Sequence, residues 1–345
     1  MSGAGILRSN TVLNQVIENL WSHALQNTTV KAYRTGFVCF ERFAAMHNLY
    51  SSVNSVFPVI NEDVLIYFVA HCYHVLNLKY TTIKLYLAGI RFTYVKAGFA
   101  NPLLSTNGSQ LPRIQIILKS VKKLQGKPLK PRLPITFNIL CKIIYTLRRG
   151  VFGPYLDVMM EAACTLAFFG FLRCGEFTKT TSYYDHKPFL TFGDIKFNNT
   201  ESLDVTLRVS KTDPFRQGVT ITIYKSNHII CPVRAMNHYF EIHRIRGFKY
   251  SGALFVKSDG KVITRIEFVD RVRQILRRLG LDEKCYSGHS FRGGAATSAA
   301  IARIEDHIIK TLGRWSSDCY TRYISTPKSA IREAQQSMAQ TEFVK

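Results

Sequence analysis

Apolar residues in the first part of the chain recur every three or four positions. One such series is Val12, Val16 and Leu20, and this spacing places side chains on one face of a helix. The same spacing occurs in residues 28–43, 61–68, 80–94 and 112–124. No strand-like alternation occurs before residue 130. The pattern therefore predicts an all-α helical domain over residues 11–125, preceded by a disordered N-terminus at residues 1–10.

A basic, proline-rich linker is predicted at residues 126–135, because its three prolines stop helices and favour an extended chain. Beyond it, alternating β-branched residues predict strands at 189–195, 202–209 and 219–223. Helices are predicted at 136–146, 155–168, 231–245, 265–279 and 303–312, in the stretch that starts at His289, and at the C-terminal end. Residues 136–345 are therefore expected to form an α+β domain, mostly helical with a small antiparallel sheet.

The net charge narrows the class of partner. The chain has 46 Lys and Arg against 23 Asp and Glu, a formal net charge of +23. Residues 1–136 carry 15 basic and 4 acidic residues (+11), and residues 137–345 carry 31 and 19 (+12), so both parts favour a polyanion such as nucleic acid. The most apolar run, residues 157–172, includes Asp157 and Glu161 and predicts a buried helix. No membrane partner is expected.

The cysteines and histidines do not indicate a metal site. Eight cysteines are scattered without a C-x-x-C pair, which fits a reducing compartment. The closest cluster is His71, Cys72 and His74; a helix surface explains it better than zinc, which needs four converging ligands.

Basic residues lie opposite the apolar stripes of the helical domain and continue into the linker. They are the candidate phosphate contacts, and an ordinary solvated surface remains the alternative for each of them. In the helices these residues are Lys31, Arg34, Lys84, Arg91, Lys119, Lys122 and Lys123, and in the linker Lys127, Lys130 and Arg132.

Two short segments near the C-terminal end form a candidate active site. Residues 288–294 read GHSFRGG and residues 312–324 read LGRWSSDCYTRYI. His289 and Arg292 are three apart and are expected to share a helix face or its leading turn. The second segment adds an indole and two phenols, from Trp315, Tyr320 and Tyr323.

An earlier arginine completes this set. Arg173 follows the apolar run, where an arginine is costly to bury without an anionic partner, and Glu176 is placed to orient it. A purely structural Arg–Glu pair is the alternative. Two guanidiniums, further hydrogen-bond donors and a phenol suit attack on a phosphodiester. Lys211 is expected on a turn between two strands, at Ser-Lys-Thr-Asp-Pro.

In these motifs the chain resembles the tyrosine recombinases, the family of the phage integrases. The matching positions cover nearly the whole chain and are Arg173 with Glu176, Lys211, His289 with Arg292, Trp315 after Leu312-Gly313, and Tyr323. The amino-acid sequence of the last segment, residues 312–324, is most similar to recombinases of Crypton and DIRS-type mobile elements. The resemblance implies a Cre-like, multidomain architecture: an all-α core-binding domain with a SAM-like helical bundle, then an α+β catalytic domain of the DNA breaking-rejoining type.

The resemblance also implies a role for each matching residue. Arg173 and Arg292 neutralise the scissile phosphate, and Tyr323 attacks phosphorus to form a 3′-phosphotyrosyl link. Lys211 protonates the departing 5′-oxygen, and His289 accepts the tyrosyl proton or orients the phosphate. Trp315 can donate only one hydrogen bond through its indole N–H. Neither a metal nor any other cofactor is then required.

Several alternatives stay open at this point. Tyr320 competes with Tyr323 as nucleophile. Gly293-Gly294 either loosens its helix or allows close packing against DNA. The C-terminal helix, with an apolar stripe at Ala330, Ile331, Ala334 and Met338, docks on its own domain or passes to a neighbouring protomer.

The expected partner is double-stranded DNA, with a homotetramer on two duplexes that is weakly associated or monomeric without DNA. No small-molecule substrate is expected. The expected activity is site-specific strand exchange through a Holliday junction by a nuclear, mobile-element recombinase. A type IB topoisomerase-like relaxing enzyme and a domesticated, non-catalytic DNA-binding protein are the alternatives.

Overall fold

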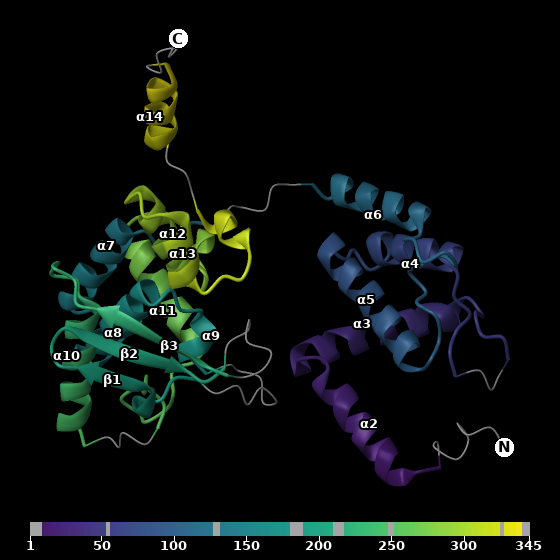
Figure 1. Ribbon diagram of the computed structural model, residues 1–345, viewed down its shortest axis with the longest axis horizontal. Coiled ribbons are helices and arrows are strands. Elements are labelled where there is room, and N and C mark those ends of the chain that lie inside the picture. The colour runs from purple at the N-terminus through teal and green to yellow at the C-terminus, as the bar shows by residue number, and fades with distance from the viewer. Residues whose placement is uncertain are drawn as a thin grey trace. The chain divides into compact units, whose positions relative to one another are not determined.

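The structure is a computed structural model that describes residues 9–52, 56–126, 132–179, 189–209, 217–247, 252–324 and 328–339. The chain forms two compact units, Met1–Leu129 and Lys130–Lys345 (Figure 1). Each unit has its own hydrophobic core. Residues 1–8 of the predicted disordered segment 1–10, and residues 127–131 of the predicted linker 126–135, lie outside the described residues.

The first unit is helical, as its apolar spacing predicts. Its helices are α2 (Thr11–His23), α3 (Asn27–Met46), α4 (Glu62–His74), α5 (Tyr80–Lys96) and α6 (Pro112–Leu124). Fully buried aromatic side chains such as Phe40 and Phe68 fill the core. The apolar stripe of α2 departs from the expected pattern because Val12, Val16 and Leu20 are exposed and α2 buries no residue.

Two glycines let α3 and α5 cross closely in this unit. A Cβ on Gly36 would lie 2.5 Å from Cα of Tyr86, and a Cβ on Gly89 would overlap the carbonyl oxygen of Tyr33. Each glycine therefore admits the backbone of the opposite helix, which a larger residue would push away. This contact fixes the faces on which α3 and α5 carry their basic residues.

The second unit places helices around a small sheet. Strands β1 (Ile195–Asn198), β2 (Ser202–Leu207) and β3 (Val219–Tyr224) form an antiparallel sheet in the order β1-β2-β3. The helices are α7 (Phe137–Arg148), α8 (Pro154–Phe169), α9 (Cys174–Phe177), α10 (Pro232–Ile245), α11 (Arg265–Arg278), α12 (Ser290–Ile301), α13 (Asp306–Gly313) and α14 (Lys328–Ala339). Short 3-10 helices are η1 (Phe192–Asp194), η2 (Glu283–Cys285) and η3 (Asp318–Tyr323). Helix α8 is buried along most of its length, as predicted.

The predicted strand at residues 189–195 is wrong for most of its length, because β1 begins only at Ile195. Residues 192–194 form η1 instead. The Asp194 carboxylate accepts hydrogen bonds from the Thr191 backbone N–H (2.8 Å) and hydroxyl (2.7 Å). This capping box stabilises a tight turn that the apolar content of the segment does not reveal.

Candidate active site

A turn between α8 and α9 gathers the candidate arginines. Phe171 adopts a left-handed backbone conformation, φ 49°. Its carbonyl accepts hydrogen bonds from Arg292 Nη1 (2.6 Å) and Arg314 Nη2 (3.0 Å). Arg173 lies two residues further on, so one turn brings together guanidiniums from widely separated parts of the chain.

The buried carboxylate of Glu176 lies beside this turn. Glu176 accepts from the Arg173 backbone N–H (2.8 Å) and from Arg173 Nη1 (3.1 Å), which is the pair expected from their spacing. It also pairs with Arg314, with 3.3 Å between Nη2 and Oε2. Glu176 is 8% exposed. The three guanidiniums and one carboxylate have a formal charge of 3 − 1 = +2, which favours an anionic ligand.

Arg292 is buried, with 1% of its surface exposed. Its Nη2 donates to the Gly313 carbonyl, and its guanidinium lies 4.4 Å from the centre of the Trp315 ring. A Cβ on Gly313 would overlap the Trp315 ring, so only glycine lets the indole fold back at this point. The Leu-Gly before Trp315 thus has a steric role in stacking the indole on the guanidinium.

His289 occupies the end of α12 rather than its buried face. It is the N-cap residue and is exposed, while Arg292, one turn later, is buried. A Cβ on the preceding Gly288 would lie 2.8 Å from Cβ of Cys174. This close approach places His289 next to the start of α9, on the side of the arginine turn.

Gly294, the second glycine after Arg292, packs against the chain itself. Helix α12 continues through both glycines without a break. A Cβ on Gly294 would overlap the Ile135 carbonyl, and the Ile135 N–H donates to Ser290 O (2.9 Å). The unbroken helix contradicts the loosening that the sequence left open, and close contact with Ile135 accounts for the glycine at position 294.

The two candidate tyrosines lie in η3, where residues three apart are one turn apart. The Tyr320 ring is 5% exposed and lies 5.8 Å from the Trp315 ring, between ring centres. Burial raises the pKa of Tyr320, and the nearby Asp306 raises it further. The Tyr323 side chain lies outside the described residues, as do Lys211, Lys127 and Lys130.

Arg314 also belongs to this cluster, although the sequence motifs did not identify it as a site residue. It lies inside the segment LGRWSSDCYTRYI but matches none of the family positions. The sequence did give one indication of its role, because Arg314 directly precedes Trp315, which is itself a candidate site residue. Its contacts with Phe171 and Glu176 depend on tertiary structure, which the motif does not show.

The described candidate DNA contacts are exposed. Lys84 on α5 and Lys122 on α6 lie on the same aromatic ring, each with Nζ 5.9 Å from the centre of Tyr80. Arg132 lies near Ser287, with 3.5 Å between Nη1 and Oγ. The other described members of the set are Lys31, Arg34, Arg91, Lys119 and Lys123.

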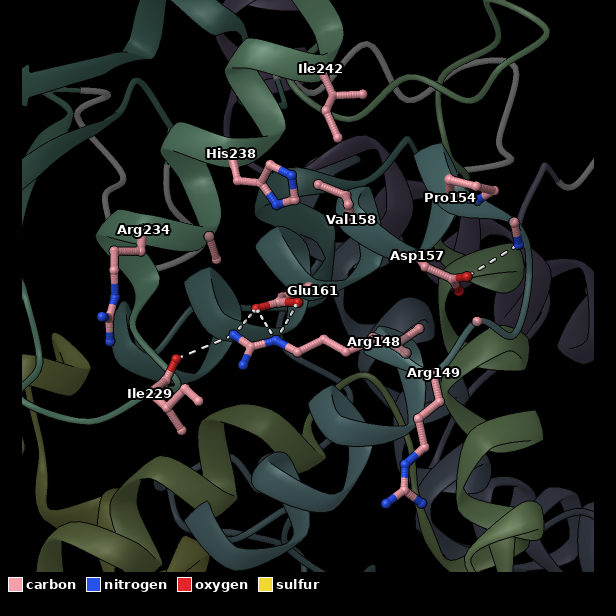
Figure 2. Close-up of a pocket in the computed structure, with 14 residues that line it drawn as sticks. Arg148, Arg149, Pro154, Asp157, Val158, Glu161, Ile229, Arg234, His238 and Ile242 are labelled. Carbon is pink, nitrogen blue, oxygen red and sulfur yellow. Dashed lines mark hydrogen bonds and ion pairs between the residues drawn. The ribbon is translucent and has the colours of Figure 1, made fainter.

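A cavity of about 830 Å³ lies elsewhere in the second unit, among α7, α8 and α10. Figure 2 shows the Arg148 guanidinium turned onto Glu161, with 2.6 Å between Nη2 and Oε1. The Asp157 carboxylate accepts from backbone N–H groups of residues 151–153. These acidic groups therefore bond to neighbouring parts of the protein, and the cavity lining contains none of the candidate site residues.

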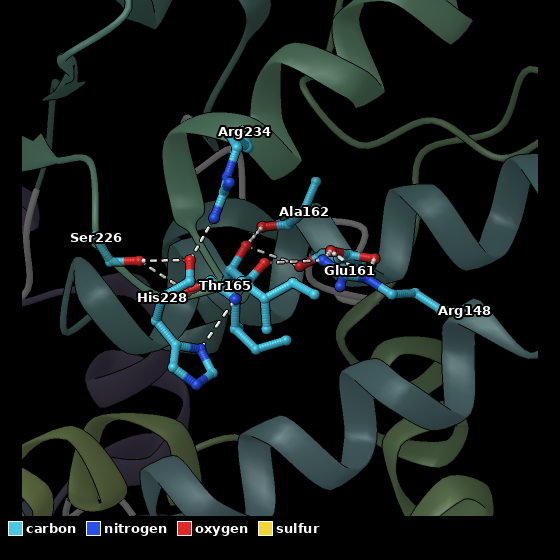
Figure 3. Close-up of polar contacts among 9 residues, drawn as sticks. Arg148, Glu161, Ala162, Thr165, Ser226, His228 and Arg234 are labelled. Carbon is cyan, nitrogen blue, oxygen red and sulfur yellow. Dashed lines mark hydrogen bonds and ion pairs between the residues drawn. The ribbon is translucent and has the colours of Figure 1, made fainter.

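The segment before α10 is anchored next to this cavity (Figure 3). Arg148 Nη2 donates to Ile229 O (3.2 Å), and Arg234 donates to His228 O. Ser226 Oγ donates to Ile230 O (2.8 Å). These bonds indicate a structural role in holding residues 226–230, so the arginine turn remains the better candidate site.

Within the described residues, no group of three His, Cys, Asp or Glu side chains is placed to hold a metal ion. None of the helices in the described part of the chain is long and apolar enough to cross a membrane.

Comparisons with known proteins identify the fold. No family model matches the chain, and no curated protein matches it. The XerH site-specific recombinase bound to a palindromic difH substrate has a TM-score of 0.65 and 14% identity, over 90% of this chain and 80% of that one. The Tn1549 transposon integrase with transposon right-end DNA has a TM-score of 0.57 and 14% identity, over 92% and 95%.

A lambda integrase dimer bound to a COC′ core site gives a TM-score of 0.52 and 16% identity, over 91% of this chain and 76% of that one. These neighbours are tyrosine recombinases and integrases. The likeness extends over both units, as the motifs in the sequence implied. The chain therefore has the tyrosine recombinase fold.

Proposed function

We propose that the chain is a site-specific DNA recombinase that cleaves and rejoins DNA through a 3′-phosphotyrosyl intermediate. The observation that carries the proposal is the meeting of Arg173, Arg292 and Glu176 at one turn, beside Trp315 and the η3 segment. The fold supports it, because the neighbours XerH, Tn1549 integrase and lambda integrase are recombinases or integrases whose structures contain DNA.

In the proposed cleavage step, the Tyr323 oxygen attacks phosphorus and the bond from phosphorus to the 5′-oxygen breaks. His289 accepts the tyrosyl proton or orients the phosphate, and Lys211 gives a proton to the leaving oxygen. Arg173 and Arg292 stabilise the charge that grows on the non-bridging oxygens. The Trp315 indole N–H adds one further hydrogen bond.

In the rejoining step, a 5′-hydroxyl from a partner strand attacks the phosphotyrosyl phosphorus and releases Tyr323. The covalent link conserves the energy of the phosphodiester bond, so the cycle needs no nucleotide cofactor. Exchange between two duplexes then passes through a Holliday junction. We propose that a homotetramer performs it in the nucleus, on behalf of a mobile element.

The surroundings of Tyr320 favour Tyr323 as nucleophile. Tyr320 is buried against Trp315, and its raised pKa opposes formation of the attacking phenolate. In this arrangement of the chain after Gly313, Tyr320 supports the indole. Tyr323 follows one turn later at the end of η3.

A covalent-trapping experiment tests the proposed function. The protein is incubated with a library of nicked duplexes of random sequence, and DNA that stays attached after denaturation is sequenced. The wild-type chain and Tyr320→Phe are expected to yield adducts through a 3′-phosphate, whereas Tyr323→Phe yields none because it lacks the attacking hydroxyl. Adduct loss in Tyr320→Phe alone would overturn the nucleophile assignment.

The trapped sequence then serves to separate recombination from simple relaxation. Plasmids with two copies of the site should give recombinant products and four-way junctions with the wild-type chain. Relaxation of supercoils at limiting protein without any recombinant would instead identify a topoisomerase. Failure of the wild-type chain to form any adduct would leave a non-catalytic DNA-binding protein.

A further inference from the structure

Arg314 contributes little to the fold through its hydrogen bonds. Both of its acceptors have another arginine as donor: the Phe171 carbonyl bonds Arg292 Nη1 at 2.6 Å, and Glu176 bonds Arg173 at 2.8 and 3.1 Å. Removing Arg314 would therefore leave neither acceptor unpaired.

The Arg314 guanidinium also has unused donors. Its side chain is 11% exposed, and its Nε and Nη1 are buried without a hydrogen-bond partner among the described residues. An unsatisfied buried donor costs about 1–3 kcal/mol, and more when it is charged. Burial lowers the pKa of Arg314; Glu176 opposes this shift and Arg173 adds to it. The group stays protonated at neutral pH.

The backbone at Arg314 adds a further cost. Arg314 is the C-cap of α13 in the left-handed conformation, φ 54° and ψ 46°. Helices usually place glycine in this conformation because a Cβ raises its energy by about 1–2 kcal/mol. An arginine that is strained, largely buried and incompletely bonded points to a ligand that is bound in another state.

We propose that Arg314 is a third phosphate-binding guanidinium, which gives its unused donors to the scissile phosphodiester alongside Arg173 and Arg292. This inference rests on the proposed function and adds to it a residue outside the matching motif. The formal charges agree: the cluster carries +2, and the pentacoordinate transition state of phosphodiester attack carries −2. Binding is thus strongest where charge is greatest, in the transition state.

Phosphate access requires a shift of the chain after Gly313. The Trp315 ring lies over Arg292, and the Tyr320 ring packs against Trp315, so the buried arginine faces an aromatic cover. Arg314 directly precedes Trp315 and so lies at the start of the segment that carries these two rings. A movement of that segment that exposes Arg292 therefore also changes the surroundings of Arg314.

The test compares Arg314→Met and Arg314→Lys with the control Arg149→Met in the full-length chain. Arg149 is an exposed arginine of the same unit, at the rim of the α7–α10 cavity (Figure 2). Single-turnover cleavage is measured on a suicide duplex that carries the trapped site. Arg314→Met should cleave about 10²-fold more slowly, the usual effect of losing one transition-state donor. Arg314→Lys should recover part of the rate, and Arg149→Met should stay within about twofold.

Two further measurements separate a phosphate ligand from a structural residue. Arg314→Met should melt no lower than the wild-type chain, and inorganic phosphate should raise its melting temperature less than that of the wild-type chain at equal ionic strength. On a methylphosphonate, which lacks the phosphate charge, the difference in cleavage rate should shrink. If Arg314→Met cleaved the methylphosphonate as slowly, relative to the wild-type chain, as it cleaves the phosphodiester, Arg314 would have a structural role and the inference would be overturned.

The inference and the proposed function fail in different ways. Equal cleavage by Arg314→Met and Arg149→Met would refute the role of Arg314 and leave the recombinase proposal standing. Absence of any wild-type adduct would refute the recombinase proposal. Even without an adduct, the melting temperatures in inorganic phosphate test whether Arg314 binds an anion. An equal rise for the wild-type chain and Arg314→Met would overturn that role, and a smaller rise for Arg314→Met would support it.

Discussion

At the scale of single residues, two acceptors organise the candidate site. The Phe171 carbonyl holds Arg292 and Arg314, and the Glu176 carboxylate holds Arg173 and Arg314. Glu176 carries the one negative charge in this set of three arginines and one carboxylate, and it is buried. Its removal should therefore have an effect opposite to that of removing Arg314.

We expect Glu176→Gln to lower the free energy of unfolding by about 3 kcal/mol, because it leaves two largely buried guanidiniums, those of Arg173 and Arg314, without their counter-charge. The amide also brings N–H donors against guanidinium donors. Urea unfolding of the full chain measures the change. Glu283→Gln is the matched control: Glu283 pairs with Arg277, which is 67% exposed, and such pairs contribute below about 1 kcal/mol. Equal effects in the two variants would contradict this account of the site.

At the scale of elements, the ends of helices determine which candidate side chains are exposed and which point inward. The end of α13 turns Arg314 inward, and the start of α12 leaves His289 exposed. Helix α14 differs from these elements because its described side chains are exposed: Ile331 is 46% and Met338 74% accessible. Glu333 of this helix forms an ion pair with Arg303, with 3.0 Å between Nη2 and Oε2.

We propose that α14 passes its apolar side to a neighbouring protomer in the DNA-bound assembly. Deleting residues 328–345 should leave the melting temperature nearly unchanged, because an exposed ion pair contributes below about 1 kcal/mol. It should abolish the tetramer on two duplexes, as measured by mass photometry. Arg303→Met, which removes only the ion pair, should still assemble. A tetramer that survives the deletion would refute the exchange.

At the scale of the whole molecule, positive charge is spread along the chain rather than placed in a tail. Within the helical unit, Lys84 and Lys122 come from different helices and meet at the Tyr80 ring. Two exposed ammonium groups beside one ring form a patch suited to a phosphate backbone. Binding through such a patch releases counterions and is therefore salt-dependent.

We predict that the double variant Lys84→Gln and Lys122→Gln binds DNA more weakly, whatever its sequence. Each lost phosphate contact reduces the slope of log K against log salt by about 0.9, so the slope should fall by about 2. Fluorescence anisotropy over a salt series measures it. Lys261→Gln serves as control, because Lys261 is 79% exposed in the other unit. An unchanged slope in the double variant would remove these lysines from the interface.

The sequence by itself determined the helical first unit, the mixed second unit, and the order of the residues that match the recombinase motifs. Helical periodicity is a local property, because residues three and four apart share a face whatever surrounds them. The misplaced strand at residues 189–195 shows the limit: the Thr191–Asp194 capping box outweighs the apolar content of that segment.

Only the tertiary structure decided how the candidate site is assembled. The left-handed turn at Phe171, the contact of Gly294 with Ile135 and the fold of Trp315 over Gly313 depend on distant segments, and side-chain spacing carries no record of them. Arg314 belongs to the site for the same reason. Its position along the chain looks ordinary, but its hydrogen bonds to the α8–α9 turn place its charge beside Arg173 and Glu176. Long-range packing, rather than local pattern, therefore determines which arginines form the cluster.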